Sequence, residues 1–553
     1  MDLNIRIAGE AGQGVLTTGN VLVGALAQTG LYVLSTKSYM SRIRGGLNWF
    51  DIRIADEPLF AGRQRADLLV ALTDSALDAL KGHVTENSVV VHDGSRIEGV
   101  IGIDLSAVAK DAGGTDIMSN TVAAGCVFGL LGYDIDLLCD FLENRFSKDS
   151  DTAAKNASCA RRGAELIGEQ HRGVLRPPAP ADAPCGVISG AEAIGMSAAA
   201  SGIKLAASYP MSPSTGVFTV LAAAADEYGI VVEQAESEIA AINMVCGAAY
   251  AGAPAMTTTS GGGFALMCEG LSLAGIMELP AVIVLAQRPG PATGLPTRTG
   301  QEDLKFAVNG GHGEFARIVI APGTIEQAHL LTRHAIEMAH KHQTPAIILV
   351  DQYLVDMQKN LPEADNSYRP IDRCVVEAGE GYLRYALTDS GISPRAIPGG
   401  AAPIVSDSDE HTTDGHLTED LVVRIEQVDK RLRKLDGLLA EALAPERYGP
   451  EDAETLLICW GSAYGPAREA VDLINKQGGA VASLHFAQPH PLNIEAARRA
   501  IGSPERIVCV EGNATGQFAS ILRQAGVIGQ CDLMSRYDGL PFTGEEIARR
   551  LDK

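Results

Sequence analysis

Short apolar runs followed by glycine-rich turns and helix-forming stretches recur along nearly the whole chain. Examples lie at 68–72, 281–286, 346–350, 456–460 and 506–510. Runs this short and this continuously apolar are typical of strands buried on both faces of a parallel sheet, with helices as the crossovers. The pattern predicts an α/β protein with mainly parallel sheets. A chain of 553 residues is too long to fold around one ordinary hydrophobic core, so we expect several domains.

Changes in composition predict where these domains begin and end. A spacer rich in proline and alanine, 176–185, separates a first α/β domain at 1–175 from a second at 186–358. Residues 359–453 are polar and lack a clear periodicity, which predicts an irregular connecting segment. The alternation of apolar runs and helical stretches resumes at 454–553. We therefore expect three domains.

Charge and hydropathy exclude several classes of protein. The net charge of −23 argues against nucleic acid or an anionic membrane surface as a partner. No apolar run approaches the roughly 18 residues that a membrane helix requires. The start, Met1-Asp-Leu-Asn-Ile-Arg, lacks the basic and apolar regions of a signal peptide. The sequence therefore predicts a soluble, cytoplasmic protein with no nucleic-acid or membrane partner.

The ten cysteines are spread widely, with neighbours at least 13 positions apart. This spacing provides no Cys-x-x-Cys pair and no iron–sulfur run of the ferredoxin kind. The His, Asp and Glu residues of 408–416 have no helical or hairpin spacing that would hold a metal, so a solvated loop is the better interpretation there. We predict no metal site on this chain. An iron–sulfur cluster, if the protein uses one, would lie on another chain.

A glycine-rich turn follows the first predicted strand, 3–8, and precedes a helical stretch and a second strand at 31–34. Glycines at a helix amino terminus can hold a phosphate. Their spacing is not that of dinucleotide-binding proteins, and Lys37 follows the second strand where those proteins carry an acid. The turn therefore predicts a phosphate-rich ligand or a purely structural turn. The candidate contacts are Gly9, Gly12, Gln13, Gly14, Lys37 and Arg44.

The clearest indication of a site lies between Tyr209 and Phe264. A predicted strand ends in the Pro/Ser-rich turn 209–215, a second ends in the carboxylate-rich segment 233–238, and a third ends in the Thr/Ser/Gly segment 257–264. Ligands of open α/β sheets bind outside such carboxyl ends. From the residues alone the candidate carboxylates are Glu233, Glu236 and Glu238. The candidate cations are Arg288 and Arg298, and His312 is a further candidate.

Taken together and in order, these motifs resemble the α subunit of the 2-oxoacid:ferredoxin oxidoreductases, and most closely the 2-oxoglutarate (KorA-like) branch. The resemblance covers nearly the whole chain, and the first domain resembles the family's γ subunit fused in front. Ala11 departs from the usual γ motif, which has glycine at this position. The segments that carry the resemblance are Tyr209-Pro-Met-Ser-Pro-Ser-Thr215, Glu238, Thr-Ser-Gly-Gly-Gly-Phe264, Arg288-Pro-Gly-Pro, Gly294-Leu-Pro-Thr-Arg298, Gly-Ile-Ser-Pro-Arg395 and Leu540-Pro-Phe-Thr-Gly-Glu-Glu-Ile.

The resemblance implies a γ-type domain, a thiamine-diphosphate pyrimidine-binding domain and a transketolase C-terminal-like domain. It implies that Glu238 is the catalytic carboxylate beside the aminopyrimidine ring. Arg298 and Arg288 would bind the substrate carboxylate, with Ser212 donating a hydrogen bond. Residues on the pyrimidine side would be Tyr209, Pro210, Glu238, Gly262, Gly263 and Phe264. The candidate contacts of the first domain would then face CoA.

The chain has no Gly-Asp-Gly motif of the kind that holds Mg²⁺ and the diphosphate in thiamine enzymes. The resemblance therefore implies a β subunit that holds the diphosphate, Mg²⁺ and a [4Fe–4S] cluster, in a dimer of αβ heterodimers that reduces ferredoxin. The implied reaction converts 2-oxoglutarate and CoA to succinyl-CoA and CO₂, or the reverse. Alternatives are the same chemistry on pyruvate or branched 2-oxoacids, a non-catalytic assembly subunit, and a nucleotide-dependent dehydrogenase, which Lys37 disfavours.

Overall fold

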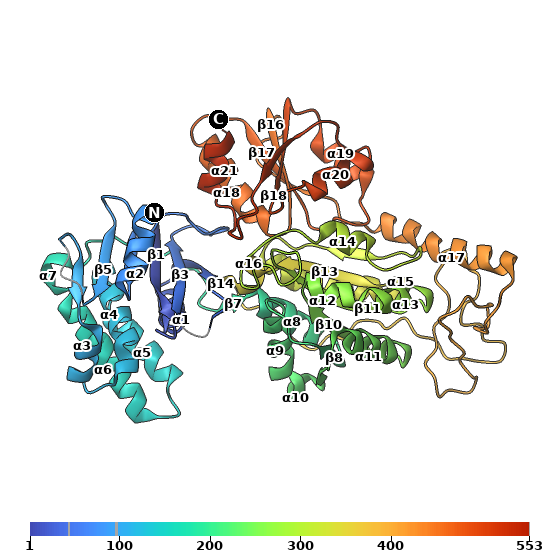
Figure 1. The fold of residues 1–553 in the computed structure, drawn as a ribbon, viewed down its shortest axis with the longest axis horizontal. Coiled ribbons are helices and arrows are strands. Elements are labelled where there is room, and N and C mark those ends of the chain that lie inside the picture. Colours follow the sequence, from blue (N-terminus) through green and yellow to red (C-terminus); the bar gives the residue numbers. More distant parts are fainter. Residues whose placement is uncertain (43–44, 95–97, 552–553) are drawn as a thin grey trace. The chain divides into compact units, whose positions relative to one another are not determined.

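The computed structural model describes residues 1–42, 45–94 and 98–551. They form two compact units, Met1–Ser189 with Met357–Ala364, and Gly190–Asp356 with Asp365–Lys553. The first boundary, which the sequence places in the spacer 176–185, falls after Ser189 in the structure. The short segment Met357–Ala364 also belongs to the first unit. The second and third expected domains together make up the second unit. The predicted α/β class with mainly parallel sheets is confirmed (Figure 1).

The first unit is built on an eight-stranded sheet of order β6-β5-β4-β1-β3-β2-β14-β7. Its strands are β1 (Asp2–Ala11), β2 (Tyr32–Ser38), β3 (Gly45–Ala55), β4 (Leu68–Ala71), β5 (Val89–Asp93), β6 (Ile101–Ile103), β7 (Val187–Ser189) and β14 (Gln358–Asn360). The expected β-α-β start is interrupted, because β3 lies between β1 and β2 and is antiparallel to both. This sheet is consequently mixed. Sequence periodicity does not report strand direction, so only the structure reveals the inserted hairpin.

Helices cover both faces of this sheet. The larger core joins Ile5 and Phe50 to Leu22 and Val127, so α1 and α4 pack on one face. Ala8 and Leu77 belong to a smaller core, which places α2 on the other face because alternate strand residues point to opposite sides. The helices of this unit are α1 (Val15–Ala27), α2 (Asp74–Leu80), α3 (Leu105–Asp111), α4 (Ser119–Leu131), α5 (Ile135–Arg145), α6 (Ser150–Leu166) and α7 (Gly168–His171).

The second unit contains two sheets. A six-stranded sheet of order β12-β13-β11-β10-β8-β9 is parallel throughout. A five-stranded sheet of order β15-β17-β16-β18-β19 is parallel except for β15. The strands are β8 (Leu205–Ser208), β9 (Val231–Gln234), β10 (Ala255–Thr259), β11 (Ala281–Gln287), β12 (Ile318–Ile320), β13 (Ala346–Asp351), β15 (Glu446–Tyr448), β16 (Thr455–Trp460), β17 (Val481–Phe486), β18 (Arg506–Glu511) and β19 (Asp532–Ser535).

One apolar core joins these two sheets, since Phe264 and Ile283 belong to the same buried cluster as Trp460 and Phe518. Helices flank the five-stranded sheet on both faces, with α18 and α21 on one side and α19 and α20 on the other (Figure 1). The helices of this unit are α8 (Gly190–Ala200), α9 (Thr215–Ala223), α10 (Ala225–Tyr228), α11 (Glu238–Tyr250), α12 (Gly261–Leu266), α13 (Cys268–Ile276), α14 (Leu304–Asn309), α15 (Ile325–His342), α16 (Gln352–Asp356), α17 (Leu421–Ala440), α18 (Tyr464–Asn475), α19 (Ile494–Ile501), α20 (Gln517–Gln524) and α21 (Gly544–Leu551).

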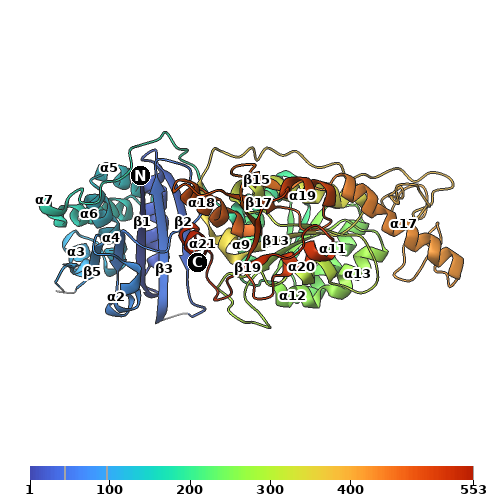
Figure 2. The same ribbon diagram turned by 90° about the horizontal axis from the view of Figure 1, so that it is seen from above.

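The prediction of an irregular segment over 359–453 is wrong for its last third, because α17 is a 20-residue helix. Figure 2 shows α17 as a long rod beside the coil that precedes it. Its buried side chains are almost all polar: Gln427, Lys430, Arg431, Lys434 and Leu438. Its exposed side chains include Leu421, Val422 and Ile425. This helix therefore buries polar side chains and exposes apolar ones, the reverse of the usual arrangement. A search for apolar residues at helical spacing could not predict its buried face.

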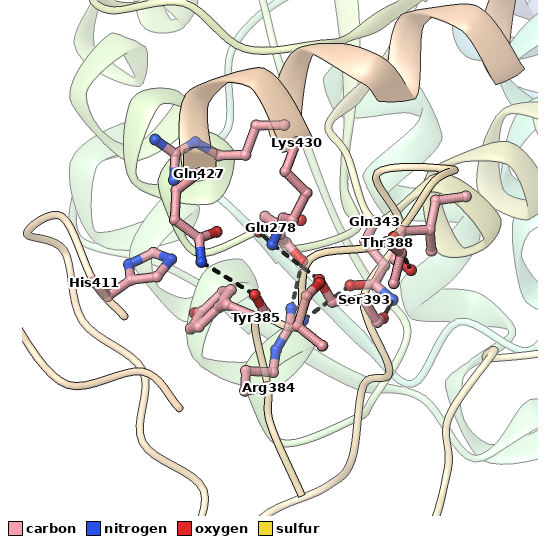
Figure 3. Close-up of polar contacts among 12 residues, drawn as sticks. Glu278, Gln343, Arg384, Tyr385, Thr388, Ser393, His411, Gln427 and Lys430 are labelled. Atoms are coloured by element: carbon pink, nitrogen blue, oxygen red, sulfur yellow. Dashed lines mark hydrogen bonds and ion pairs between the residues drawn. The ribbon is translucent and has the colours of Figure 1, made fainter. Parts of the chain in front are cut away.

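Buried ion pairs account for this inversion (Figure 3). The carboxylate of Glu278, fully buried after α13, lies 2.6 Å from Lys430 Nζ and 2.6 Å from Lys434 Nζ. Arg384 donates to the Glu278 carbonyl at 3.0 Å, and Gln427 donates to the Tyr385 carbonyl at 3.1 Å. These contacts attach both α17 and the preceding coil to the body of the second unit.

Candidate functional site

Glu238 is the carboxylate that the structure selects at the end of β9. It opens α11, and the Ser237 side chain caps this helix by accepting from Ala240 N at 3.2 Å. Glu238 is only 4% exposed, and its Oε1 has no hydrogen-bond partner among the described residues. Glu233 and Glu236 are exposed. Leaving a buried carboxylate oxygen without a hydrogen bond costs free energy. We therefore expect a bound ligand to donate a hydrogen bond to Glu238.

The glycine-rich first turn of helix α12, which follows β10, lies against this carboxylate. A Cβ on Gly263 would lie 2.7 Å from Glu238 Oε1 and 2.1 Å from Thr259 Oγ1. A Cβ on Gly261 would lie 2.4 Å from Asp303 Oδ2. The turn therefore passes between two carboxyl groups at a distance that only glycine permits. In β10 and just before α12, two further buried oxygens lack a partner among the described residues, Thr257 Oγ1 and Ser260 Oγ.

Gly263→Ala is expected to destabilise the folded chain by about 1–3 kcal/mol, the usual cost of overpacking a tight site. Its new methyl group would overlap Thr259 and Glu238. Gly262→Ala is the matched control, because the nearest atom to a Cβ there is 3.8 Å away. Thermal unfolding of both variants tests this prediction. Equal melting temperatures would contradict the close packing around Gly263.

The turn after β8 holds the next group of predicted residues. Tyr209 is 41% exposed, Pro210 is half-buried and Ser212 is exposed. Arg288, at the end of β11, donates from a terminal guanidinium nitrogen to the Ser212 carbonyl at 2.7 Å. The structure thus brings Ser212 and Arg288 together. Partial burial lowers the pKa of Arg288, although a guanidinium stays charged at neutral pH.

Arg298 lies further along the same loop, where the five-stranded sheet supports it. Thr299 N donates to the Gly539 carbonyl at 3.2 Å, and a Cβ on Gly539 would lie 3.0 Å from Arg298 Cβ. Gln301 donates to the Trp460 carbonyl at 2.9 Å and accepts from Gly512 N at 2.7 Å. Burial lowers the pKa of Arg298. Gly539 immediately precedes the Leu540-Pro-Phe-Thr-Gly motif. The start of this family-like motif therefore packs against the loop that carries Arg298.

Two predicted residues lie elsewhere. The Phe264 side chain is fully buried and packs edge-to-face on Phe306, with ring centroids 5.0 Å apart. It supports the glycine turn from the core and does not present its ring to a ligand. His312 is exposed and lines a separate cavity of about 550 Å³ with Ser272 and Arg431. His312 is therefore not a member of the Glu238 site.

The glycine turn of the first unit has the geometry expected of a loop before a helix. Gly12 and Gly14 have positive φ, and α1 begins directly after Gly14. The Gln13 side chain accepts from Glu10 N at 2.6 Å and so stabilises the loop itself. Lys37 lies within β2, with its Nζ 6.0 Å from the centroid of the Phe50 ring. The candidate Arg44 lies outside the described residues.

Sequence reasoning missed two carboxyl groups at the strand ends of the six-stranded sheet. Asp351 ends β13, accepts from Ser462 Oγ and Leu354 N, and has its pKa raised to about 6 by burial. Asp303 lies where the loop after β11 ends, and burial raises its pKa to about 6 as well. Both look like ordinary acidic residues in the sequence. Only their burial distinguishes them.

Comparison with known proteins first defines the class. Residues 196–430 match the family described as "Pyruvate flavodoxin/ferredoxin oxidoreductase, thiamine diP-bdg", and residues 4–166 match "Pyruvate ferredoxin/flavodoxin oxidoreductase". The chain is thus built from domains of thiamine-diphosphate-dependent oxidoreductases. Among the described residues, no helix is long and apolar enough to cross a membrane.

Individual relatives then define the family. The 2-oxoacid:ferredoxin oxidoreductase subunit alpha of Saccharolobus solfataricus is 30% identical, over 99% of this chain and 97% of that protein. The 2-oxoglutarate oxidoreductase subunit KorA of Mycobacterium tuberculosis is 30% identical, over 99% and 90%. The solved 2-oxoglutarate:ferredoxin oxidoreductase of Magnetococcus marinus matches with a TM-score of 0.93 and 30% identity, over 100% and 99%. The chain belongs to the 2-oxoacid:ferredoxin oxidoreductase family as an α subunit. The resemblance seen in the sequence is confirmed, and the chain is a component of a multi-subunit enzyme.

Proposed function

We propose that this chain is the α subunit of a 2-oxoglutarate:ferredoxin oxidoreductase. The reaction is the CoA-dependent oxidative decarboxylation of 2-oxoglutarate to succinyl-CoA and CO₂ with reduction of ferredoxin, or its reverse. The observation that carries the proposal is the buried Glu238 carboxylate against Gly263, whose Oε1 has no hydrogen-bond partner within 1–42, 45–94 and 98–551. The KorA-named relatives and the solved 2-oxoglutarate enzyme support the choice of substrate.

The residues present fit the pyrimidine half of thiamine diphosphate. A flat ring with a protonated ring nitrogen could donate a hydrogen bond to the orphaned Oε1 of Glu238. The Gly263 backbone provides a close approach without a side chain. When bound, thiamine diphosphate supplies the carbon nucleophile that attacks the keto group. Glu238 Oε1 would hold the proton shared with the ring nitrogen, which is the role of a positioned general acid–base group.

Arg298 and Arg288 are the groups that we assign to the carboxylates of the 2-oxoacid, with Ser212 at the same turn. A guanidinium binds a carboxylate through two parallel hydrogen bonds. Both arginines are partly buried on the loop after β11, and burial strengthens such a pair because water competes less. Two cations suit a substrate with two carboxylates.

Arg298→Gln is expected to raise the KM for the 2-oxoacid by about 10- to 100-fold, since one charged hydrogen bond contributes about 1.5–3 kcal/mol. The kcat should change less, because the lost contact serves binding. Steady-state kinetics of the assembled enzyme measure both quantities. Arg333→Gln removes an exposed ion pair with Glu337 and is the control. An unchanged KM in Arg298→Gln would remove this residue from the substrate site.

The other half of the site belongs, in this proposal, to a β subunit that holds the diphosphate, Mg²⁺ and a [4Fe–4S] cluster. The complete enzyme would be a dimer of αβ heterodimers that passes electrons to ferredoxin. The first domain, 1–175, would be the γ-type domain, with its Gly9–Gly14 turn and Lys37 toward the phosphates of CoA. Gly9 and Lys37 lie near the same end of β3, because Gly9 pairs with Asn48 and Lys37 pairs with Phe50, two residues further along that strand. An unchanged KM for CoA in Lys37→Ala would argue against this contact.

Co-expression with a β subunit of the same family and purification of the complex tests the function. We expect CoA-dependent CO₂ release and ferredoxin reduction, with 2-oxoglutarate preferred over pyruvate and branched 2-oxoacids. If the enzyme preferred pyruvate, the proposed chemistry would stand and the proposed substrate would be wrong. Turnover that requires neither CoA nor thiamine diphosphate would overturn the proposal. Metal and iron analysis of each separated subunit would locate the cluster.

A further inference from the structure

Asp303 is a second carboxyl group at the Glu238 site, and the proposed function leaves it without a role. Its backbone N–H donates to Gln287 Oε1 at 3.0 Å, which fixes it beside the end of β11. Its Oδ2 is buried and has no hydrogen-bond partner among the described residues. The carboxyl group lies against Gly261, at the opposite end of the turn that Gly263 places against Glu238.

A structural role as a helix cap does not account for Asp303. It occupies the position before α14, yet its side chain accepts no hydrogen bond from the first turn of that helix. It forms no ion pair within the described residues either, although Arg288 exerts an attractive charge on it. A buried carboxyl group that caps no helix, and whose Oδ2 has no partner in the part of the chain that the structure describes, is a candidate functional residue beside Arg288 and the Gly261–Gly263 segment.

The charges of Arg288 and Glu302 act on Asp303. Arg288 directly follows β11, Glu302 precedes Asp303 in the loop, and Glu238 lies against Gly263, two residues along from Gly261, which lies against Asp303. Lys305 is directed away, because its Nζ donates to Ser520 Oγ at 2.8 Å. Burial raises the pKa of Asp303 to about 6, the Glu302 charge adds to this effect, and Arg288 opposes it. Asp303 therefore changes its charge close to neutral pH.

We propose that Asp303 is a positioning residue that controls how firmly Arg288 holds the carboxylate of the 2-oxoacid. With Asp303 protonated, the Arg288 cation has the Ser212 carbonyl as its partner and can also bind the substrate carboxylate. When Asp303 releases its proton to solvent, its carboxylate attracts the same guanidinium and competes with the substrate. The inference rests on the proposed function, because it assumes a 2-oxoacid at Arg288.

The pH dependence of KM tests this control in the assembled αβ enzyme. We expect the wild-type KM for 2-oxoglutarate to rise about tenfold between about pH 5 and pH 8, with a smaller change in kcat. Asp303→Asn should keep KM low and nearly constant over this range. Glu302→Gln should move the rise to lower pH, because it removes a charge that raises the pKa of Asp303. If Asp303→Asn keeps the wild-type pH profile, or changes KM and kcat equally at every pH, the inference is wrong.

Thermal unfolding provides a readout that needs no substrate. A carboxyl group whose folded pKa is raised binds its proton more tightly in the folded state, so its stability cost develops as pH rises from about 4 to about 6 and stays above that. Asp303→Asn should therefore gain in melting temperature over wild type above about pH 6 and match it below about pH 4. A difference that does not vary with pH would overturn the inference. A pH-dependent difference in a complex that binds no 2-oxoacid would instead overturn the proposed function, and the substrate role of Asp303 with it.

Discussion

Glu238→Gln is expected to lower 2-oxoacid-dependent ferredoxin reduction by about 10²- to 10⁴-fold, the range that a positioned acid–base group contributes. The amide has nearly the shape of the carboxylate but can neither accept nor return a proton. Glu238 is 4% exposed and its Oε1 accepts no hydrogen bond from the described residues, so an uncharged amide of the same shape breaks no contact seen at that oxygen. Folding and assembly should therefore survive while turnover collapses.

Activity assays on purified complexes, with size-exclusion chromatography as the check on assembly, measure this effect. Glu236→Gln is the matched control, since Glu236 lies two residues earlier in the chain and is exposed. It should retain near-wild-type turnover. Near-wild-type turnover in Glu238→Gln would favour the alternative of a non-catalytic assembly subunit. Loss of the complex itself would indicate a structural role.

Glu278→Gln is expected to destabilise the second unit by about 3–5 kcal/mol, the usual cost of breaking a buried ion pair on one side. The side chains of Glu278 and Lys430 are fully buried and that of Lys434 is 3% exposed. Burial alone would raise the pKa of Glu278, but the charges of Lys434 and Lys430 lower it below its ordinary value. The variant leaves two buried ammonium groups without a counterion.

The loss should be larger near pH 6 than near pH 9. Burial already lowers the pKa of Lys434 to about 8, and removal of Glu278 lowers it further, so high pH lets the lysine become neutral. Melting temperatures at both pH values measure this difference. Glu337→Gln breaks the exposed Arg333 pair and should cost less than about 1 kcal/mol. Equal losses in the two variants would mean that the buried cluster does not hold α17.

Sequence reasoning succeeded where the signal is local. The continuous apolar runs at 281–286 and 346–350 became the buried strands β11 and β13, and the glycine-rich turn that ends at Gly14 preceded the predicted helix α1. It failed at α17, because the partners of Lys430 and Lys434 come from a residue more than 150 positions away in the chain. It also failed at β3, because the direction of a strand depends on which neighbour it pairs with.

Part of the candidate site could likewise be predicted from the sequence, and part only from the structure. The order of the motifs from Tyr209 to Leu540 identified the family, and the residue types at Glu238 and Arg298 indicated acid–base and carboxylate chemistry. The sequence by itself determined that much, since these features depend on residue identity and short spacing. The tertiary structure decided which of three nearby glutamates is buried, that Gly539 supports Arg298, and that Asp303 faces the glycine turn. Burial and pairing arise from contacts between residues far apart in the chain, and local sequence patterns do not report such contacts.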